Sequence, residues 1–159
     1  MERSEDGSVV DEETGLPNRE GWNALLEVEE QRTKRHGGVH GLILIELEVT
    51  ATDGEFVEQV AGALTRSIRE TDHLARIDHR TFGVLVLYCD SLGTVIDRIR
   101  DELGSTMVVP PPVSSIDARP AGPELRTTWW EMVTGAEAER ARPAVRYVEF
   151  VAPFRACLN

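Results

Sequence analysis

The 159-residue chain contains 41% hydrophobic and 28% charged residues, which suits one domain with a single core and excludes two domains of typical size. Its 28 acidic residues outnumber 17 basic ones, and the formal net charge of -11 disfavours non-specific binding to nucleic acid or to an anionic membrane surface. Lys34 is the only lysine, so arginines must supply the local cations for any anionic ligand.

Other features predict a cytoplasmic chain without membrane insertion. The N-terminal sequence lacks the apolar segment of a signal peptide, and the longest apolar run, Phe82–Cys89, is much shorter than a membrane span. Cys89 and Cys157 are too few for a disulfide framework or a zinc site, so we expect reduced, structural thiols.

The chain divides into a polar, disordered lead-in over residues 1–10, a domain over 11–151 and a tail over 152–159. Apolar spacing predicts helices over residues 17–36, 56–70, 91–103 and 124–142, with Pro17 at the first helical position. Apolar or alternating runs predict strands over residues 41–48, 74–77, 82–88, 107–109, 113–118 and 145–151. This order indicates a mixed α/β (α+β) domain with helices covering a sheet.

Trp129 and Trp130 stand side by side in the last predicted helix. In acidic surroundings, such a pair is more typical of one core residue and one rim residue than of a base-stacking platform.

A resemblance to a known family begins at the first predicted helix. The segment Asp11-Glu-Glu-Thr-Gly-Leu-Pro-Asn-Arg19 resembles the DxLTGLxNR opening of GGDEF domains, the diguanylate cyclase family that condenses two GTP into cyclic di-GMP. The similarity continues to about residue 105, through LILIELE, the helix before Asp72 and the DRIR of Asp97–Arg100. It implies a nucleotide-cyclase-like palm fold with a mostly antiparallel, five-stranded central sheet covered by helices.

The catalytic loop of the family is degenerate in this sequence. Active members carry GGDEF or GGEEF at the tip of the central hairpin, where the third residue is an acid that binds magnesium. Aligned on Phe82, the five places are Asp78, His79, Arg80, Thr81 and Phe82. Both glycines are absent, and Arg80 inverts the charge of the metal-binding acid, so we expect no bound magnesium.

Two further departures concern GTP. The second acid of the family's metal site corresponds to Glu46, a vestigial acid that would face Arg80 across the site. About ten residues of the nucleotide-binding segment after Glu48 are missing, and the lysine of the family's last helix has no counterpart. The resemblance therefore implies a catalytically inactive domain that is not an enzyme and needs no cofactor.

The product-binding inhibitory site of the family is retained. Its RxxD motif precedes the GGDEF loop by five residues, and this chain has Arg69-Glu70-Thr71-Asp72 at that spacing before Asp78. Arg98 corresponds to a supporting arginine of the family, and Arg76 is a further candidate. We expect Arg69, Asp72, Arg98 and Arg76 to bind cyclic di-GMP as a regulatory ligand.

Alternatives remain open at this stage. Arg69 with Asp72 could be a surface ion pair, and Arg98 could decorate the solvent face of a helix. Asp72, His73, Asp78 and His79 resemble a metal-ligand set, but strand alternation separates them, so no metal site is expected.

The leading prediction for the function is a cyclic di-GMP receptor that forms a homodimer or binds a signalling protein. The alternative is a ligand-free interaction or dimerisation module derived from a GGDEF domain.

Overall fold

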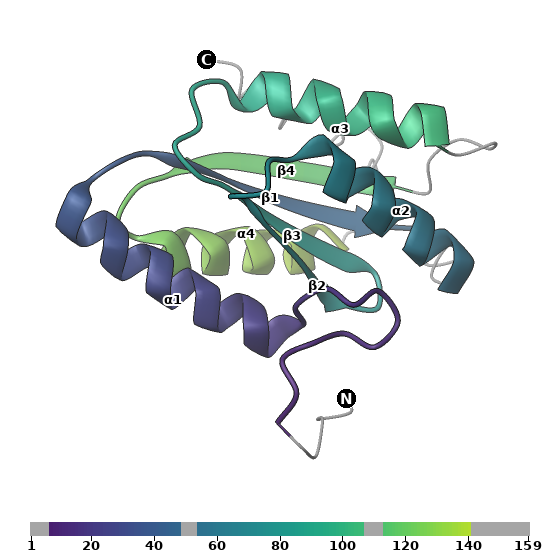
Figure 1. The fold of residues 1–159 in the computed structure, drawn as a ribbon, viewed down its shortest axis with the longest axis horizontal. Helices are drawn as coiled ribbons and strands as arrows, with labels where there is room; N and C mark the ends of the chain where they lie inside the picture. Colours follow the sequence, from purple (N-terminus) through teal and green to yellow (C-terminus); the bar gives the residue numbers. More distant parts are fainter. Residues whose placement is uncertain (1–6, 49–53, 107–112, 141–159) are drawn as a thin grey trace.

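The computed structural model describes residues 7–48, 54–106 and 113–140 (Figure 1). Within these ranges, four strands form one sheet of order β2-β3-β1-β4, in which every neighbouring pair is antiparallel. The strands are β1 (His40–Leu47), β2 (His73–Asp78), β3 (Thr81–Val86) and β4 (Val113–Ala121). The expected α/β class and antiparallel sheet are confirmed. The described residues supply four strands where five were expected, and the strands predicted over 107–109 and 145–151 lie outside these residues.

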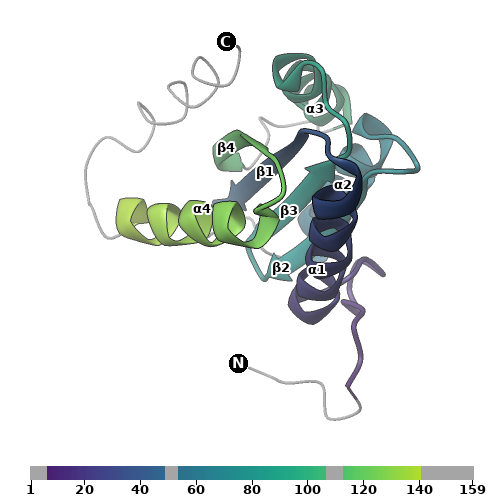
Figure 2. The ribbon, with the colours of Figure 1, turned by 90° about the vertical axis from the view of Figure 1, so that its left-hand side faces the viewer.

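Helices cover both faces of the sheet. On one face lie α1 (Arg19–His36) and α4 (Leu125–Arg140), and on the other lie α2 (Gly54–Ser67) and α3 (Leu92–Thr106) (Figures 1 and 2). Ile43 and Ile45 of β1 pack with α2 and α3, whereas Leu42 and Leu44 pack with α1 and α4. The central strand is therefore buried on both faces, which explains its uninterrupted apolar sequence.

The start of α1 differs from the prediction. The helix begins at Arg19 and not at Pro17, because the side-chain oxygen of Asn18 caps it by accepting a hydrogen bond from the Gly21 amide at 3.0 Å. Pro17 instead pairs with Val10, and the Val9 carbonyl accepts a hydrogen bond from the Asn18 amide at 2.9 Å. Residues 7–10, which we assigned to a disordered lead-in, thus pack against the start of α1.

Two other boundaries also move. The helix α2 ends at Ser67, before the predicted end at Glu70, because the chain turns at Arg69–Asp72, where the Asp72 amide donates to the Arg69 carbonyl at 3.0 Å. Strand β4 extends past the predicted end at Ala118 to Ala121. It includes Pro120, which is tolerated because β4 is an edge strand within the described sheet.

Two tryptophans pack over a glycine on the α1 and α4 face. The Trp22 and Trp129 rings meet edge to face, with centroids 4.9 Å apart. A Cβ atom on Gly83 of β3 would lie 2.9 Å from Trp22 and 3.0 Å from Trp129, so glycine permits this close packing. Trp129 is 7% exposed and Trp130 is 66% exposed, as predicted for a core residue beside a rim residue.

None of the helices within the described ranges is long and apolar enough to cross a lipid bilayer.

Candidate functional site

The degenerate loop forms a tight turn between β2 and β3. Asp78 pairs with Thr81, which leaves His79 and Arg80 as the two turn residues. The Asp78 carboxylate accepts a hydrogen bond from the Arg80 amide at 3.0 Å, and Phe82 is fully buried in the core. The turn is thus closed by an aspartate side chain, in place of the conformational freedom that two glycines would give.

Arg80 is buried at the end of β1. Its Nε and Nη2 atoms both donate to the Leu47 carbonyl, at 3.1 and 3.0 Å, and the Arg80 carbonyl accepts from the Leu47 amide at 2.7 Å. Arg80 is 9% exposed. A guanidinium therefore fills the place that the alignment gives to the metal-binding acid, and it binds a backbone oxygen there.

Glu46 directly precedes Leu47, whose carbonyl binds Arg80. It is buried, and the Ser115 hydroxyl donates to its Oε1 atom at 3.2 Å. Glu46 lines two small clefts beside α4, of about 180 and 220 Å³, and Arg80 lines neither of them. The Arg80 guanidinium is instead directed at the backbone carbonyl of Leu47, the next residue along β1.

Arg76 does not join the predicted ligand site. It is buried, and it forms ion pairs with Asp11, at 3.4 Å, and with Glu13, while its Nη2 donates to the His79 carbonyl at 2.9 Å. The backbone amide of Arg76 also donates to the Pro17 carbonyl at 2.9 Å. The N-terminal segment thus lies along β2, and its two acids neutralise the buried Arg76. Arg76 therefore does not line the pocket that contains Arg69, Asp72 and Arg98, as the sequence had led us to expect.

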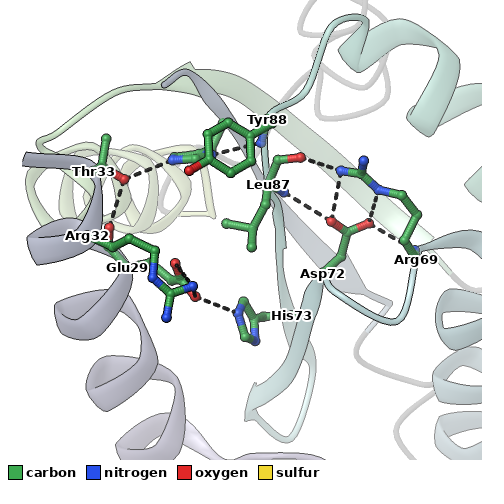
Figure 3. A network of polar contacts seen from close by, with 9 residues as sticks. Glu29, Arg32, Thr33, Arg69, Asp72, His73, Leu87 and Tyr88 are labelled. Atoms are coloured by element: carbon green, nitrogen blue, oxygen red, sulfur yellow. Dashed lines mark hydrogen bonds and ion pairs between the residues drawn. The ribbon is translucent and has the colours of Figure 1, made fainter. Parts of the chain in front are cut away.

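The RxxD motif forms a compact turn between α2 and β2 (Figure 3). Arg69 donates to the Asp72 carboxylate through its backbone amide at 2.9 Å, and through Nε and Nη2 at 3.1 Å each. The Leu87 amide donates to the same carboxylate at 3.0 Å, and the Leu87 carbonyl accepts from Arg69 Nη2. The hydrogen bond with Asp72 raises the pKa of Arg69. The pair thus joins the turn to the end of β3.

Arg69, Asp72 and Arg98 line one open pocket of about 240 Å³. The pocket also includes Ser91 and Thr94 at the start of α3, where the Thr94 amide donates to the Ser91 hydroxyl at 3.3 Å. A helix N-terminus and two guanidinium groups favour an anion. The structure therefore brings together three of the four predicted ligand residues.

Two more side chains in the pocket affect its charge. Asp90 is exposed, and its negative charge partly offsets the positive charge of the arginines. Burial raises the pKa of the Cys89 thiol, so the thiol is neutral near pH 7. The local cations are thus Arg69 and Arg98.

A polar network that the sequence did not predict lies beside this turn (Figure 3). The buried Glu29 carboxylate contacts His73 Nε2 at 3.1 Å, and buried His40 accepts from the Tyr88 amide through Nδ1 at 2.9 Å. The Thr33 hydroxyl lies 2.8 Å from His40 Nε2, so the hydrogen of the neutral ring is on Nε2. Burial lowers the pKa of His40, against the raising effect of Glu29.

The four residues that resembled a metal-ligand set have separate partners. Asp72 binds the turn and β3, His73 contacts Glu29, Asp78 closes the hairpin turn, and His79 is exposed. Within the described ranges, histidine, cysteine, aspartate and glutamate side chains form no cluster of three that could hold a metal ion.

Comparison with known proteins identifies the fold. No family model matches the sequence, and no curated protein matches it. Among solved structures, the chain is similar to the diguanylate cyclase SiaD of Pseudomonas aeruginosa, solved with its activator SiaC, with 25% identity and a TM-score of 0.66. The match covers 82% of this chain and 56% of the SiaD chain, so this chain corresponds to little more than half of SiaD.

Two isolated GGDEF domains match over most of their length. The GGDEF domain of DgcB from Caulobacter crescentus, solved with cyclic di-GMP, has a TM-score of 0.71 and 16% identity over 89% of this chain and 94% of that one. The FimX GGDEF domain from Pseudomonas aeruginosa has a TM-score of 0.60 and 15% identity over 95% and 91% of the two chains. The chain has the GGDEF-domain fold, as the sequence resemblance implied.

Proposed function

We propose that this chain is a catalytically inactive GGDEF-like domain that binds cyclic di-GMP and acts as its receptor. The observation that carries the proposal is the shared pocket of Arg69 and Arg98 at the N-terminus of α3. Two guanidinium forks suit the phosphates and guanine edges of such a ligand, and they offer local positive charge on a chain of net charge -11. The DgcB domain, solved with cyclic di-GMP, supports the choice of ligand.

The arrangement of Arg80 at the turn between β2 and β3, the hairpin end, supports the proposed loss of catalysis. The family resemblance implies magnesium there, a hard cation that prefers carboxylate and carbonyl oxygens. In this chain the Leu47 carbonyl is already bound by the Arg80 guanidinium, whose positive charge would repel the ion. These residues do not fit magnesium, so we assign no metal-dependent step to the domain.

Calorimetric titration with cyclic di-GMP tests the receptor function. The wild-type protein should bind at concentrations up to tens of micromolar, and Arg69→Ala and Arg98→Ala should each weaken binding at least tenfold. Arg35→Ala is the matched control, because it removes an exposed arginine from the last turn of α1, away from the pocket. Absence of wild-type binding, or unchanged binding by Arg69→Ala, contradicts the proposal.

Loss of catalysis has its own test. Incubation of the purified protein with GTP and magnesium should yield no cyclic di-GMP above the buffer control in chromatography. Measurable product that disappears when Glu46 is also substituted would contradict the proposed loss of catalysis.

The second candidate function is a protein-interaction or dimerisation module. It is favoured by Trp130, which is 66% exposed at the cleft of about 180 Å³ between α1 and α4, and by the activator complex of SiaD. Size-exclusion chromatography separates the two functions. A receptor should change its oligomeric state when cyclic di-GMP is added, whereas a ligand-free module should associate without it and lose association in Trp130→Ala.

A further inference from the structure

The carboxylate of Asp72 has no acceptor position left for a ligand. A carboxylate offers about four lone-pair sites. The Oδ1 atom accepts from Arg69 Nη2 and the Leu87 amide, and Oδ2 accepts from the Arg69 amide and Nε. The Asp72 side chain is also only 2% exposed. A ligand in the pocket therefore meets neither a free acceptor nor accessible surface at Asp72.

The guanidinium of Arg69, in contrast, is only partly used. Of its five N–H groups, one on Nε and one on Nη2 bind Asp72, and the second on Nη2 binds the Leu87 carbonyl. Within the described residues, the two N–H groups of Nη1 have no protein acceptor, and the side chain is 52% exposed. Three hydrogen bonds thus fix the plane of the fork and leave one edge for a ligand.

We infer that Asp72 is a positioning residue, which holds Arg69 in its binding orientation and does not itself contact the ligand. This inference rests on the proposed binding of cyclic di-GMP in this pocket. It differs from what the RxxD resemblance implies, since there the arginine and the aspartate both grip the nucleotide. In this chain Asp72 keeps its bonds to Leu87 in the complex, and the free edge of Arg69 forms the contact together with Arg98.

A matched pair of variants tests the inference by the direction of the change. Asp72 and Asp90 both line the pocket, so replacing either by asparagine removes one negative charge near an anionic ligand. Asp90→Asn should improve cyclic di-GMP affinity, by up to threefold, because it removes only the repulsion. Asp72→Asn should weaken affinity at least fivefold, because the amide nitrogen cannot accept from Arg69 and the fork loses its fixed orientation. An improvement in both variants would overturn the positioning role.

Amide hydrogen exchange of the wild-type protein distinguishes positioning from direct contact without any substitution. If Asp72 stays on the Leu87 amide, protection of that amide should be equal or greater after saturation with cyclic di-GMP. Faster exchange at Leu87 in the complex would show that Asp72 has turned to the ligand, which overturns the inference and leaves the receptor function standing. Failure of the wild-type protein to bind cyclic di-GMP would overturn both.

Discussion

Near each end of β3 an arginine donates to a backbone carbonyl oxygen, and the two arginines differ in how much of the side chain remains accessible. At the hairpin end, Arg80 is 9% exposed and is directed at Leu47. At the pocket end, the side chain of Arg69 is 52% exposed, and Arg98 lines the same pocket. The same residue type is thus buried against the backbone at one end and leaves an accessible edge in a pocket at the other.

Removing the buried arginine should have the largest effect. Arg80→Ala leaves the Leu47 carbonyl without its two charged donors and removes buried packing, so the free energy of unfolding should fall by about 3 kcal/mol. Urea unfolding measures the loss, and cyclic di-GMP affinity of the folded variant should stay within twofold. Arg35→Ala, on the exposed end of α1, should change stability by less than about 0.5 kcal/mol. A similar stability in both variants would remove the contrast between the ends.

Between these two ends, Gly83 in the middle of β3 tests the close packing of the two tryptophans against the strand. A Cβ atom in Gly83→Ala would lie 2.9 Å from Trp22, and the resulting strain should lower the free energy of unfolding by about 2 kcal/mol. Gly104→Ala is the control, because that α3 position has open space and alanine favours a helix, by about 1 kcal/mol at most. Thermal and urea unfolding should move in opposite directions for the two variants, and equal shifts would contradict the close packing at Gly83.

The binding edge of Arg69 can be separated from its charge. Arg69→Lys keeps a positive charge but has no planar fork, so cyclic di-GMP affinity should fall about fivefold, or about 1 kcal/mol, less than in Arg69→Ala. Calorimetry compares the two variants at the same ionic strength. An affinity equal to wild type would show that the pocket needs only a charge, and the contrast with Arg80 would then rest on burial alone.

Much of the fold could be predicted from apolar spacing, since the periodicity of LILIELE and of residues 56–68 reports which faces are buried. The first and last residues of the helices and strands were less predictable, because local hydrogen bonds, such as that from the Gly21 amide to the Asn18 side chain, fix them. The RxxD register together with Arg98 also predicted three residues that line one pocket. Arg69 and Asp72 lie in the turn between α2 and β2, and Arg98 lies on α3.

The partners of buried charges could not be predicted. Arg76 was expected in the pocket, but its acids come from residues 11 and 13, more than sixty positions away, and no local pattern reports such a pairing. Glu29 and Arg80 look like ordinary surface residues in the sequence, yet both are buried. The use of all four acceptor sites of Asp72 likewise depends on Leu87, which only the sheet brings close.

His40 provides the smallest expected effect, and it is confined to the pocket end of β3. Its neutral ring accepts the Tyr88 amide, and burial lowers its pKa below 6.5 against the opposing effect of Glu29. The unfolded chain therefore binds a proton before the native state does as pH falls, so the free energy of unfolding should decrease below about pH 6.5. In His40→Asn, whose side-chain oxygen can accept the same amide, this part of the pH dependence should vanish in urea unfolding between pH 7.5 and 5. His36→Asn changes an exposed histidine and should retain it. If both variants keep the wild-type pH dependence, the acid sensitivity arises elsewhere and does not distinguish this end of β3 from the hairpin end.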